Sequence, residues 1–342
     1  MGYGELIAIE YHADLKEVQL DARLSSLLSP AQQAAPFDRL DWLQGLASVC
    51  NMEPVVAAAR DDESLVVLPL SKSDDQLIGL ANYYTFRFRP LLSDTGDAKA
   101  LLCALARDLG GRTHRITLTG VPDEDGSATL LEECFRETGW LVLREECDSN
   151  HVLPLGGRSW DEYFSGLPGR LRSTIKRKKK GLDCRILSCF DQAAWDSYEA
   201  IYRESWKPEE GSIEFLRRFA EHEGAAGRLR LGIASAEGKP VAAQVWTVEG
   251  GTAFIHKLAY RDSARSLSPG SVLSAALFEH VIEHDKVDLV DYGTGNDGYK
   301  RDWMEEVRPR YRLEFFRANV PKNWFSVAKS QLQRLARGRK HG

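Results

Sequence analysis

A glycine-rich stretch late in the sequence places reactive side chains directly after an apolar run. Residues 291–303 read DYGTGNDGYKRDW and follow VDLV, which is typical of a buried strand. Two interpretations are open: a flexible turn with a solvated short helix, or the mouth of an active site. In the second, the phenol of Tyr299 can serve as an acid, and Lys300 can hold an anion or stabilise an oxyanion.

A second segment, RDSARSLSPGSVLSAAL, predicts a helix whose first amides point at a ligand. Ser268 is a good N-cap residue, Pro269 suits the first helical position, and Gly270 lets a ligand approach the backbone. Such a helix start carries partial positive charge and can hold a phosphate or pyrophosphate. A well-capped helix without a ligand is the alternative. Arg265, three residues ahead of Ser268, favours the phosphate-binding interpretation.

The elements that must position these segments alternate between helix and strand. Apolar periodicity and turn residues predict an antiparallel meander followed by a long apolar helix and a further strand. The predicted elements are a strand at 183–189, helices at 191–206 and 212–224, a three-stranded meander at 228–261, a helix at 268–285, a strand at 286–292, a short helix at 296–306 and a strand at 308–318.

The first half predicts a weaker version of the same order, which indicates a fold-level repeat. Its predicted elements are a helix at 37–50, strands at 54–60, 64–70 and 82–88, a helix at 97–109, a strand at 115–120, a helix at 128–139 and a strand at 140–146. We expect domains at 1–150 and 151–320, a helical connection at 159–180 and a basic tail at 321–342. The first half lacks a glycine at its helix start, so we expect the phosphate site only in the second half.

The composition is that of a folded protein of two domains. The chain has 342 residues, 43% hydrophobic and 28% charged, and its net charge of -5 gives no general affinity for polyanions. The six cysteines form no C-x-x-C pair, which argues against a structural zinc site. The start of the sequence has no apolar core of a signal peptide, and no apolar run is long enough to span a bilayer. We therefore expect a cytoplasmic protein.

Four segments together resemble the GNAT superfamily, and specifically its CelD-type acetyltransferases linked to cellulose and exopolysaccharide biosynthesis. They are LPGRLRSTIKRKKKGL, ESWK, KPVAAQVWTVEGGTAFIHKLAYRDSARSLSPGSVL and VDYGTGNDGYKRDW, within roughly residues 150–317. The architecture is also similar to FemAB-type aminoacyl transferases, which pair two GNAT-like folds. The resemblance implies an α/β (α+β) fold of two tandem GNAT-like domains, each a mixed, mostly antiparallel sheet flanked by helices.

The resemblance also implies a cosubstrate and how it is held. The expected cosubstrate is acetyl-CoA or another acyl-CoA, with no metal, and the acceptor group is an amine or, less often, a hydroxyl. In these enzymes an R/Q-x-x-G-x-G/A loop cradles the pyrophosphate of coenzyme A. Arg265, Ser268 and Gly270 match this loop, with Ser271 beside them, although Ser268 replaces the usual glycine.

The resemblance also implies roles for residues 291–303. The strand before it is expected to splay from its neighbour, so that the acyl thioester enters the gap. Gly293 and Gly295 would then leave room for the acyl arm or the acceptor. Tyr299 matches a tyrosine that protonates the departing thiolate.

A base is also needed, because an ammonium ion is not a nucleophile. Asp291, Asp297 and His256 are the candidates, and His256 has the most suitable intrinsic pKa. The structural alternatives are that His256 pairs across the sheet and that Asp291 pins the glycine-rich turn. For acceptor binding we expect Asp297, Trp206 and Gln244, although Trp206 could instead pack on the adjacent helix.

Two basic runs leave the choice of partner open. Residues 170–180 contain seven cations, which suit a solvated helix face, tRNA, an anionic lipid head group or the phosphates of a sugar carrier. The tail at 329–342 is a second basic stretch, consistent with peripheral contact at the inner membrane face.

Three functions follow in order of preference. The first is an acyl-CoA-dependent N-acyltransferase acting on an amino sugar or related small molecule, in exopolysaccharide or envelope biosynthesis. The second is a FemAB-like transferase that uses aminoacyl-tRNA. The third is a GNAT-fold protein that binds a glycan or partner without catalysis.

Overall fold

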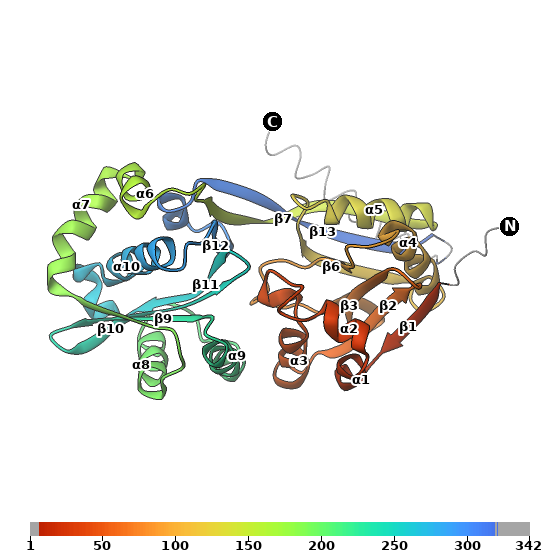
Figure 1. The fold of residues 1–342 in the computed structure, drawn as a ribbon, viewed down its shortest axis with the longest axis horizontal. Helices are drawn as coiled ribbons and strands as arrows, with labels where there is room; N and C mark the ends of the chain where they lie inside the picture. Colours follow the sequence, from red (N-terminus) through yellow and green to blue (C-terminus); the bar gives the residue numbers. More distant parts are fainter. Residues whose placement is uncertain (1–6, 319, 321–342) are drawn as a thin grey trace. The chain divides into compact units, whose positions relative to one another are not determined.

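The computed structural model describes residues 7–318 and residue 320, which belong to two compact units (Figure 1). The second unit comprises residues 34–36 and 149–308, and the other described residues form the first. The chain passes from the first unit into the second within β7 (Trp140–Pro154). It returns to the first within β13 (Glu306–Arg317). The strand β7 pairs with β12 of the second unit, and β13 pairs with β6 of the first.

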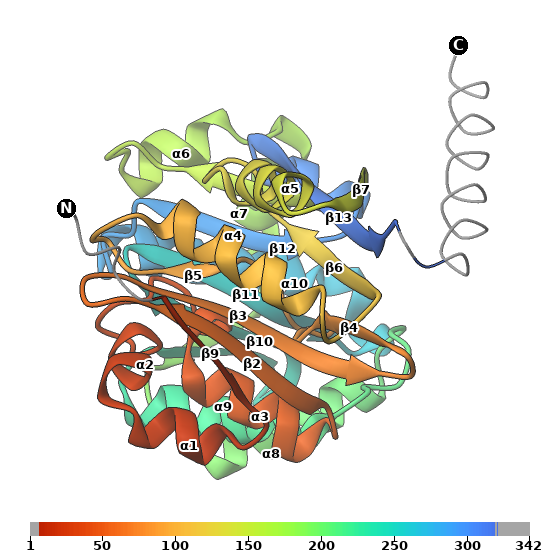
Figure 2. The same cartoon turned by 90° about the vertical axis from the view of Figure 1, so that its right-hand side faces the viewer.

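The first unit is a mixed sheet with helices on both faces. Its strands are hydrogen-bonded in the order β1-β2-β3-β4-β6-β13-β7, and β5 pairs with β3. Helices α4 and α5 cover one face and α1, α2 and α3 the other (Figure 2). The elements are β1 (Ala8–His12), α1 (Leu15–Leu20), α2 (Ala22–Leu27), α3 (Leu40–Val49), β2 (Glu53–Arg60), β3 (Leu65–Ser73), β4 (Gln76–Gly79), β5 (Leu91–Leu92), α4 (Ala98–Leu109), β6 (Arg115–Val121) and α5 (Ser127–Glu137).

The second unit repeats this plan with the strand order β7-β12-β11-β10-β9-β8. Helices α6, α7 and α10 lie on one face of the sheet, and α8 and α9 lie on the other (Figure 1). The elements are α6 (Trp160–Gly166), α7 (Gly169–Lys178), the 3₁₀ turn η2 (Lys179–Gly181), β8 (Asp183–Leu187), α8 (Gln192–Arg203), α9 (Ile213–Ala225), β9 (Leu229–Ala236), β10 (Lys239–Glu249), β11 (Thr252–Tyr260), η3 (Asp262–Leu267), α10 (Pro269–Glu283), β12 (Leu289–Thr294) and η4 (Gly298–Asp302).

Each unit contains a parallel strand pair whose members are joined through a helix. In the first unit β4 and β6 run parallel, with α4 between them in the chain. In the second unit β11 and β12 run parallel, with α10 between them. The β8–β9, β9–β10 and β10–β11 pairs are antiparallel, as the meander predicted. The predicted fold class, two mostly antiparallel mixed sheets flanked by helices, is confirmed.

The structure corrects two of the sequence predictions. Residues 82–88 form turns rather than a strand, although Tyr84, Phe86 and Phe88 are buried. Their alternation reflects a loop that buries every second ring. Residues 309–317 pair with β6 and belong to the first unit, so the second unit does not continue to 320 as expected.

Short elements near the start of the chain were not predicted. The strand β1 and the helices α1 and α2 are each five or six residues long, which is too short for a clear periodic pattern. The predicted basic tail at 321–342 lies outside the described residues. No helix in the described part of the chain is long and apolar enough to span a membrane.

Candidate functional site

The sheet of the second unit opens between β11 and β12. Their parallel pairing runs from Thr252 and Leu289 to Phe254 and Asp291, and it ends there. The strand β11 continues to Tyr260 and pairs there with β10. Within the described residues its pairing with β12 does not extend beyond Phe254, and we call the region between the two strands beyond this point the gap.

A β-bulge in each strand explains why the pairing ends at this point. Opposite Val245 and Trp246 of β10, the strand β11 carries one extra residue, His256. Between Asp291 and Thr294, β12 also shifts register against β7. Bulges bend a strand and increase its local twist, so two of them placed just beyond the last pair separate the strands.

The first turn of α10 lies beside the part of β11 that borders the gap. A Cβ added to Gly270 would lie 3.2 Å from Tyr260 Cδ1 and 3.8 Å from Leu258 Cδ1. Gly270 is therefore required for close packing of the helix on the strand, whereas the sequence suggested room for a ligand. The N-cap residue Ser268 makes no side-chain hydrogen bond to the start of α10. Because Pro269 has no N–H, the amides of Gly270, which is buried, and Ser271 are the first main-chain donors of the helix.

Ser268 does not cap α10 with its side chain, and this part of the sequence prediction is wrong. Its backbone is left-handed, with φ 50° and ψ 46°, and its carbonyl accepts from the Val272 amide at 3.2 Å. This conformation is the one that glycine adopts without strain, which explains why related loops have glycine there. Arg265 lies in η3, exposed to solvent, one turn ahead of the helix.

Gln244 holds the first turns of α10 on the sheet. Its amide nitrogen donates to the Gly270 carbonyl at 3.1 Å and to Ser274 Oγ at 2.8 Å. Its amide oxygen accepts from Trp246 Nε1 at 2.8 Å. Gln244 is fully buried, so the structure does not place it in an acceptor cleft as expected. It fixes the position of the uncapped amides instead.

The glycine-rich turn after β12 is held by two buried charged residues. Asp291 Oδ1 accepts from the Gly293 amide at 2.8 Å and from Asn150 Nδ2 at 3.1 Å. The Lys300 ammonium donates to the carbonyl of Thr294 and lies 3.5 Å from that of Gly293. Both residues are less than 10% exposed. They stabilise the turn, which matches the structural alternative raised for Asp291.

Gly293 and Gly295 have positive φ values of 69° and 100°. An L-amino acid is strained in this region, so the backbone of the turn itself requires glycine at both positions. The sequence argument had assigned these glycines to the passage of a ligand.

Tyr299 follows this turn and is 39% exposed, the most accessible of the expected catalytic side chains. Its ring packs edge-on against Tyr292, with centroids 5.8 Å apart. Partial burial, with a smaller contribution from the Asp297 carboxylate, raises the pKa of Tyr299 to about 12. The phenol is therefore neutral across the physiological range and can donate a hydrogen bond or a proton.

Lys207 and Lys257 form a basic cluster with Glu210 beside the turn. Lys257 Nζ is 2.8 Å from Glu210 Oε2, and both side chains are mostly buried. Burial lowers the pKa of Lys207 to about 8; the Lys257 charge lowers it further, whereas Asp297 and Glu210 oppose the shift. These interactions place the loop after α8 beside β11 and the turn after β12. The sequence analysis assigned no role to Lys257 or Glu210, and it included Lys207 only as part of the segment ESWK.

A cavity of about 400 Å³ lies between the end of α8 and the start of α9. Its walls combine carboxylates with cations and a phenol. The lining residues are Glu199, Tyr202, Arg203, Lys207, Pro208, Glu209, Glu210 and Ile213. Lys207 and Glu210 thus belong both to the cavity wall and to the basic cluster. A small polar acceptor with an amine suits this lining.

His256 is engaged across the sheet. Its Nε2 is 2.8 Å from Thr247 Oγ1 on β10, and its ring packs edge-on against Phe219 of α9. This is the structural alternative considered from the sequence. Trp206 is 47% exposed and stacks on Tyr260 with centroids 4.3 Å apart. Trp206 therefore packs beside the end of β11, whose Tyr260 lies close to Gly270.

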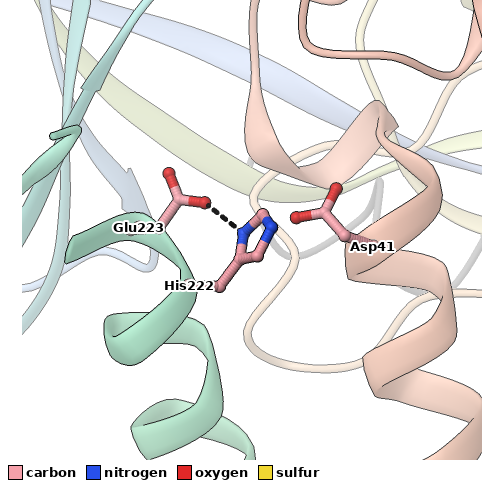
Figure 3. Close-up of side chains that lie close together, drawn as sticks. All are labelled: Asp41, His222 and Glu223. Atoms are coloured by element: carbon pink, nitrogen blue, oxygen red, sulfur yellow. Dashed lines mark hydrogen bonds and ion pairs between the residues drawn. The ribbon is translucent and has the colours of Figure 1, made fainter. Parts of the chain in front are cut away.

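On α9, the buried carboxylate of Glu223 accepts from Arg228 Nε at 2.7 Å and lies 3.2 Å from His222 Nδ1 (Figure 3). This ion pair anchors the end of the helix to the start of β9. Asp41, also drawn in Figure 3, belongs to the first unit, and we assign no site to the three residues together.

The equivalent helix of the first unit is capped. Asp97 accepts from the Ala100 amide at 2.9 Å at the start of α4. A carboxylate already satisfies a main-chain donor there and repels a second anion. The two units therefore differ at the feature that would bind a phosphate.

Comparison with known proteins agrees with this geometry. Residues 169–301 match the model of the acetyltransferase (GNAT) domain family. No curated protein sequence matches the chain.

Solved structures share the whole two-unit fold. FemX is 10% identical with a TM-score of 0.62, over 92% of this chain and 99% of FemX. The C-terminal domain of a putative lysylphosphatidylglycerol synthetase from Agrobacterium fabrum is 13% identical with a TM-score of 0.58, over 93% and 97%. A tandem GNAT protein of the clavulanic acid biosynthesis pathway is 12% identical with a TM-score of 0.50, over 90% and 98%. The chain therefore has a tandem GNAT fold, and its second unit has the fold of a transferase.

Proposed function

We propose that this protein is an acyl-CoA-dependent N-acyltransferase that transfers an acetyl group to the amine of an amino sugar or a related small molecule. The observation that carries the proposal is the uncapped start of α10 beside the gap between β11 and β12. A pyrophosphate needs main-chain donors, and a thioester needs a slot that leads to an acceptor. In the second unit the main-chain donors of the first turn of α10 lie beside the part of β11 that borders the gap.

In this proposal the amides of Gly270 and Ser271 hold the pyrophosphate of coenzyme A, and Arg265 adds charge from the exposed η3 turn. The acyl arm lies in the gap, where main-chain amides of β11 beyond its pairing with β12 polarise the thioester carbonyl. Tyr299 protonates the departing thiolate from the other side of the gap. The pKa of about 12 keeps its proton in place until that step.

A second candidate is a transferase that uses aminoacyl-tRNA. One observation favours it: α7 and η2 carry seven cations between Arg170 and Lys180, and five of them are exposed to solvent. An exposed basic helix of this kind suits a nucleic acid backbone. Phosphates of a lipid-linked sugar or an anionic membrane surface would use the same charges.

Calorimetry separates the two candidates. The wild-type protein is titrated with acetyl-CoA, with longer acyl-CoAs and with aminoacyl-tRNA at fixed ionic strength. We expect binding of acetyl-CoA and none of aminoacyl-tRNA. Binding of the tRNA without binding of any acyl-CoA would overturn the proposal in favour of the second candidate.

A further inference from the structure

Lys207 lines the cavity beside the basic cluster, where burial lowers its pKa. It follows α8, lines the 400 Å³ cavity and lies with its Nζ 5.9 Å from the Trp206 ring centroid. The three neighbouring ammonium and carboxylate groups are already engaged: Lys257 with Glu210, and Lys300 with the carbonyls of the turn. Lys207 thus belongs both to the cavity wall and to the basic cluster beside β11.

We propose that Lys207 is the general base that deprotonates the acceptor amine, an inference that rests on the function proposed above. The acceptor ammonium in the cavity gives one proton to the neutral Lys207 amine. The free amine then attacks the thioester carbonyl carbon; the C–N bond forms and the C–S bond breaks. Tyr299 gives its proton to the leaving thiolate. As the amide forms, the attacking nitrogen loses its second proton, which returns to the Tyr299 phenolate, and Lys207 later releases the first proton to solvent.

Charged groups on every neighbouring element set the protonation of Lys207. Burial favours its neutral form, the cations Lys257 and Lys300 act in the same direction, and Glu210 and Asp297 oppose them. The remaining charged groups of the cavity wall are Glu199, Arg203 and Glu209. A base whose pKa lies near the working pH is the most effective, because it is partly neutral and still accepts a proton readily.

Two of the three bases that the sequence suggested, His256 and Asp291, are less suited to this step. His256 Nε2 faces Thr247 at 2.8 Å, and the ring packs between Phe219 and Phe254. Asp291 is committed to the Gly293 amide and to Asn150. Lys207, by contrast, lines a cavity large enough for a small acceptor.

The test compares Lys207→Arg with Lys207→Met. Arginine keeps the positive charge but cannot give up its proton, so it preserves any role in anion binding and removes a role as base. With acetyl-CoA and glucosamine as probes, we expect both variants to lose about 100-fold in kcat. We also expect both to bind acetyl-CoA as the wild type does. Lys239→Arg, an exposed lysine at the start of β10, is the matched control.

Three results would overturn the inference. One is a Lys207→Arg variant with wild-type kcat and an unchanged pH profile. Another comes from NMR of the protein with ¹³C-dimethylated lysines, in which the Lys207 signal is identified by its absence from the Lys207→Arg variant. This signal should titrate near pH 8. Titration at the ordinary pH of a lysine would contradict the inference, whatever the acceptor is. Failure of the wild type to bind acetyl-CoA would instead remove the proposed function, and the inference with it.

Discussion

At the scale of single residues, the site separates groups that hold the backbone from groups that face the reactants. Asp291 and Lys300 bind the glycine-rich turn, and both are buried. Tyr299 is exposed at the gap, and Lys207 lines the adjacent cavity. The chemistry of the proposed reaction therefore depends on the second pair, while its geometry depends on the first.

Replacing Tyr299 with phenylalanine tests the role of the phenol. The ring and its contact with Tyr292 remain, so we expect folding and acetyl-CoA affinity to be unchanged. Loss of the proton donor should lower kcat by about 100-fold. Steady-state kinetics with acetyl-CoA and glucosamine measure this, and a variant with full turnover would remove Tyr299 from the mechanism.

Replacing Lys207 with methionine should change stability in a pH-dependent way. The folded-state pKa of about 8 is below the ordinary value of 10.5, so the charged form is disfavoured by folding. At pH 7 both states of the wild type carry the proton and the folded state bears the full penalty, so the variant should be more stable. The penalty falls between pH 8 and pH 10.5, and the gain should shrink there. Urea unfolding at pH 7 and pH 10 measures the difference; an equal effect at both values contradicts the expectation.

The sequence predicted Arg265, Gly270 and Tyr299 as candidate site residues because each lies in a short segment with a distinctive pattern. It gave Gln244 an acceptor role because a strand pattern does not tell which face meets a helix. Lys207 gained no role because its lowered pKa depends on burial by segments distant in the sequence. Such long-range surroundings cannot be inferred from spacing.

At the scale of elements, the two bulges and the anchoring of α10 create the site. Apolar periodicity predicted α8, α9 and α10, and β-branched alternation predicted the meander. The bulge at His256 left no mark in the sequence, because one extra residue does not alter the composition of a strand. The separation of β11 and β12 was predicted from the resemblance to a family, because local sequence patterns do not indicate it.

Removing the Gln244 side-chain amide should loosen the start of α10. In Gln244→Leu the Ser274 hydroxyl, the Gly270 carbonyl and Trp246 Nε1 each lose a buried hydrogen bond. We expect a loss of about 1–3 kcal/mol in the free energy of unfolding. Acetyl-CoA should bind more weakly. Gln19→Leu, at an exposed position of α1, is the control, and equal effects of the two changes would show that the buried network does not position the helix.

At the scale of the whole molecule, one fold occurs twice, and the equivalent helices α4 and α10 differ in how they begin. The sequence indicated the repeat from its order of elements. It did not show that residues 309–317 return to the first unit, because strand pairing is not encoded by local pattern. Asp97 caps α4, whereas no side chain caps α10.

This asymmetry predicts the binding stoichiometry. We expect each chain to bind one acetyl-CoA. The affinity should not change in Asp97→Asn, because α4 is not part of the proposed site and the amide oxygen of asparagine still caps this helix. Calorimetry gives the number directly. Two equivalent sites per chain would contradict the assignment of donor binding to the second unit.

The central claim is that the pyrophosphate of coenzyme A binds at the start of α10. Its most direct test introduces there a carboxylate, which the start of α4 already has in Asp97. Ser268→Asp places a carboxylate at the start of the helix, and Ser268→Asn places a neutral side chain of the same shape there. Both residues tolerate the left-handed backbone of position 268. Titration with acetyl-CoA should show binding to the wild type and to Ser268→Asn, and strongly reduced binding to Ser268→Asp. Equal binding to all three proteins would show that the pyrophosphate does not lie at the start of α10.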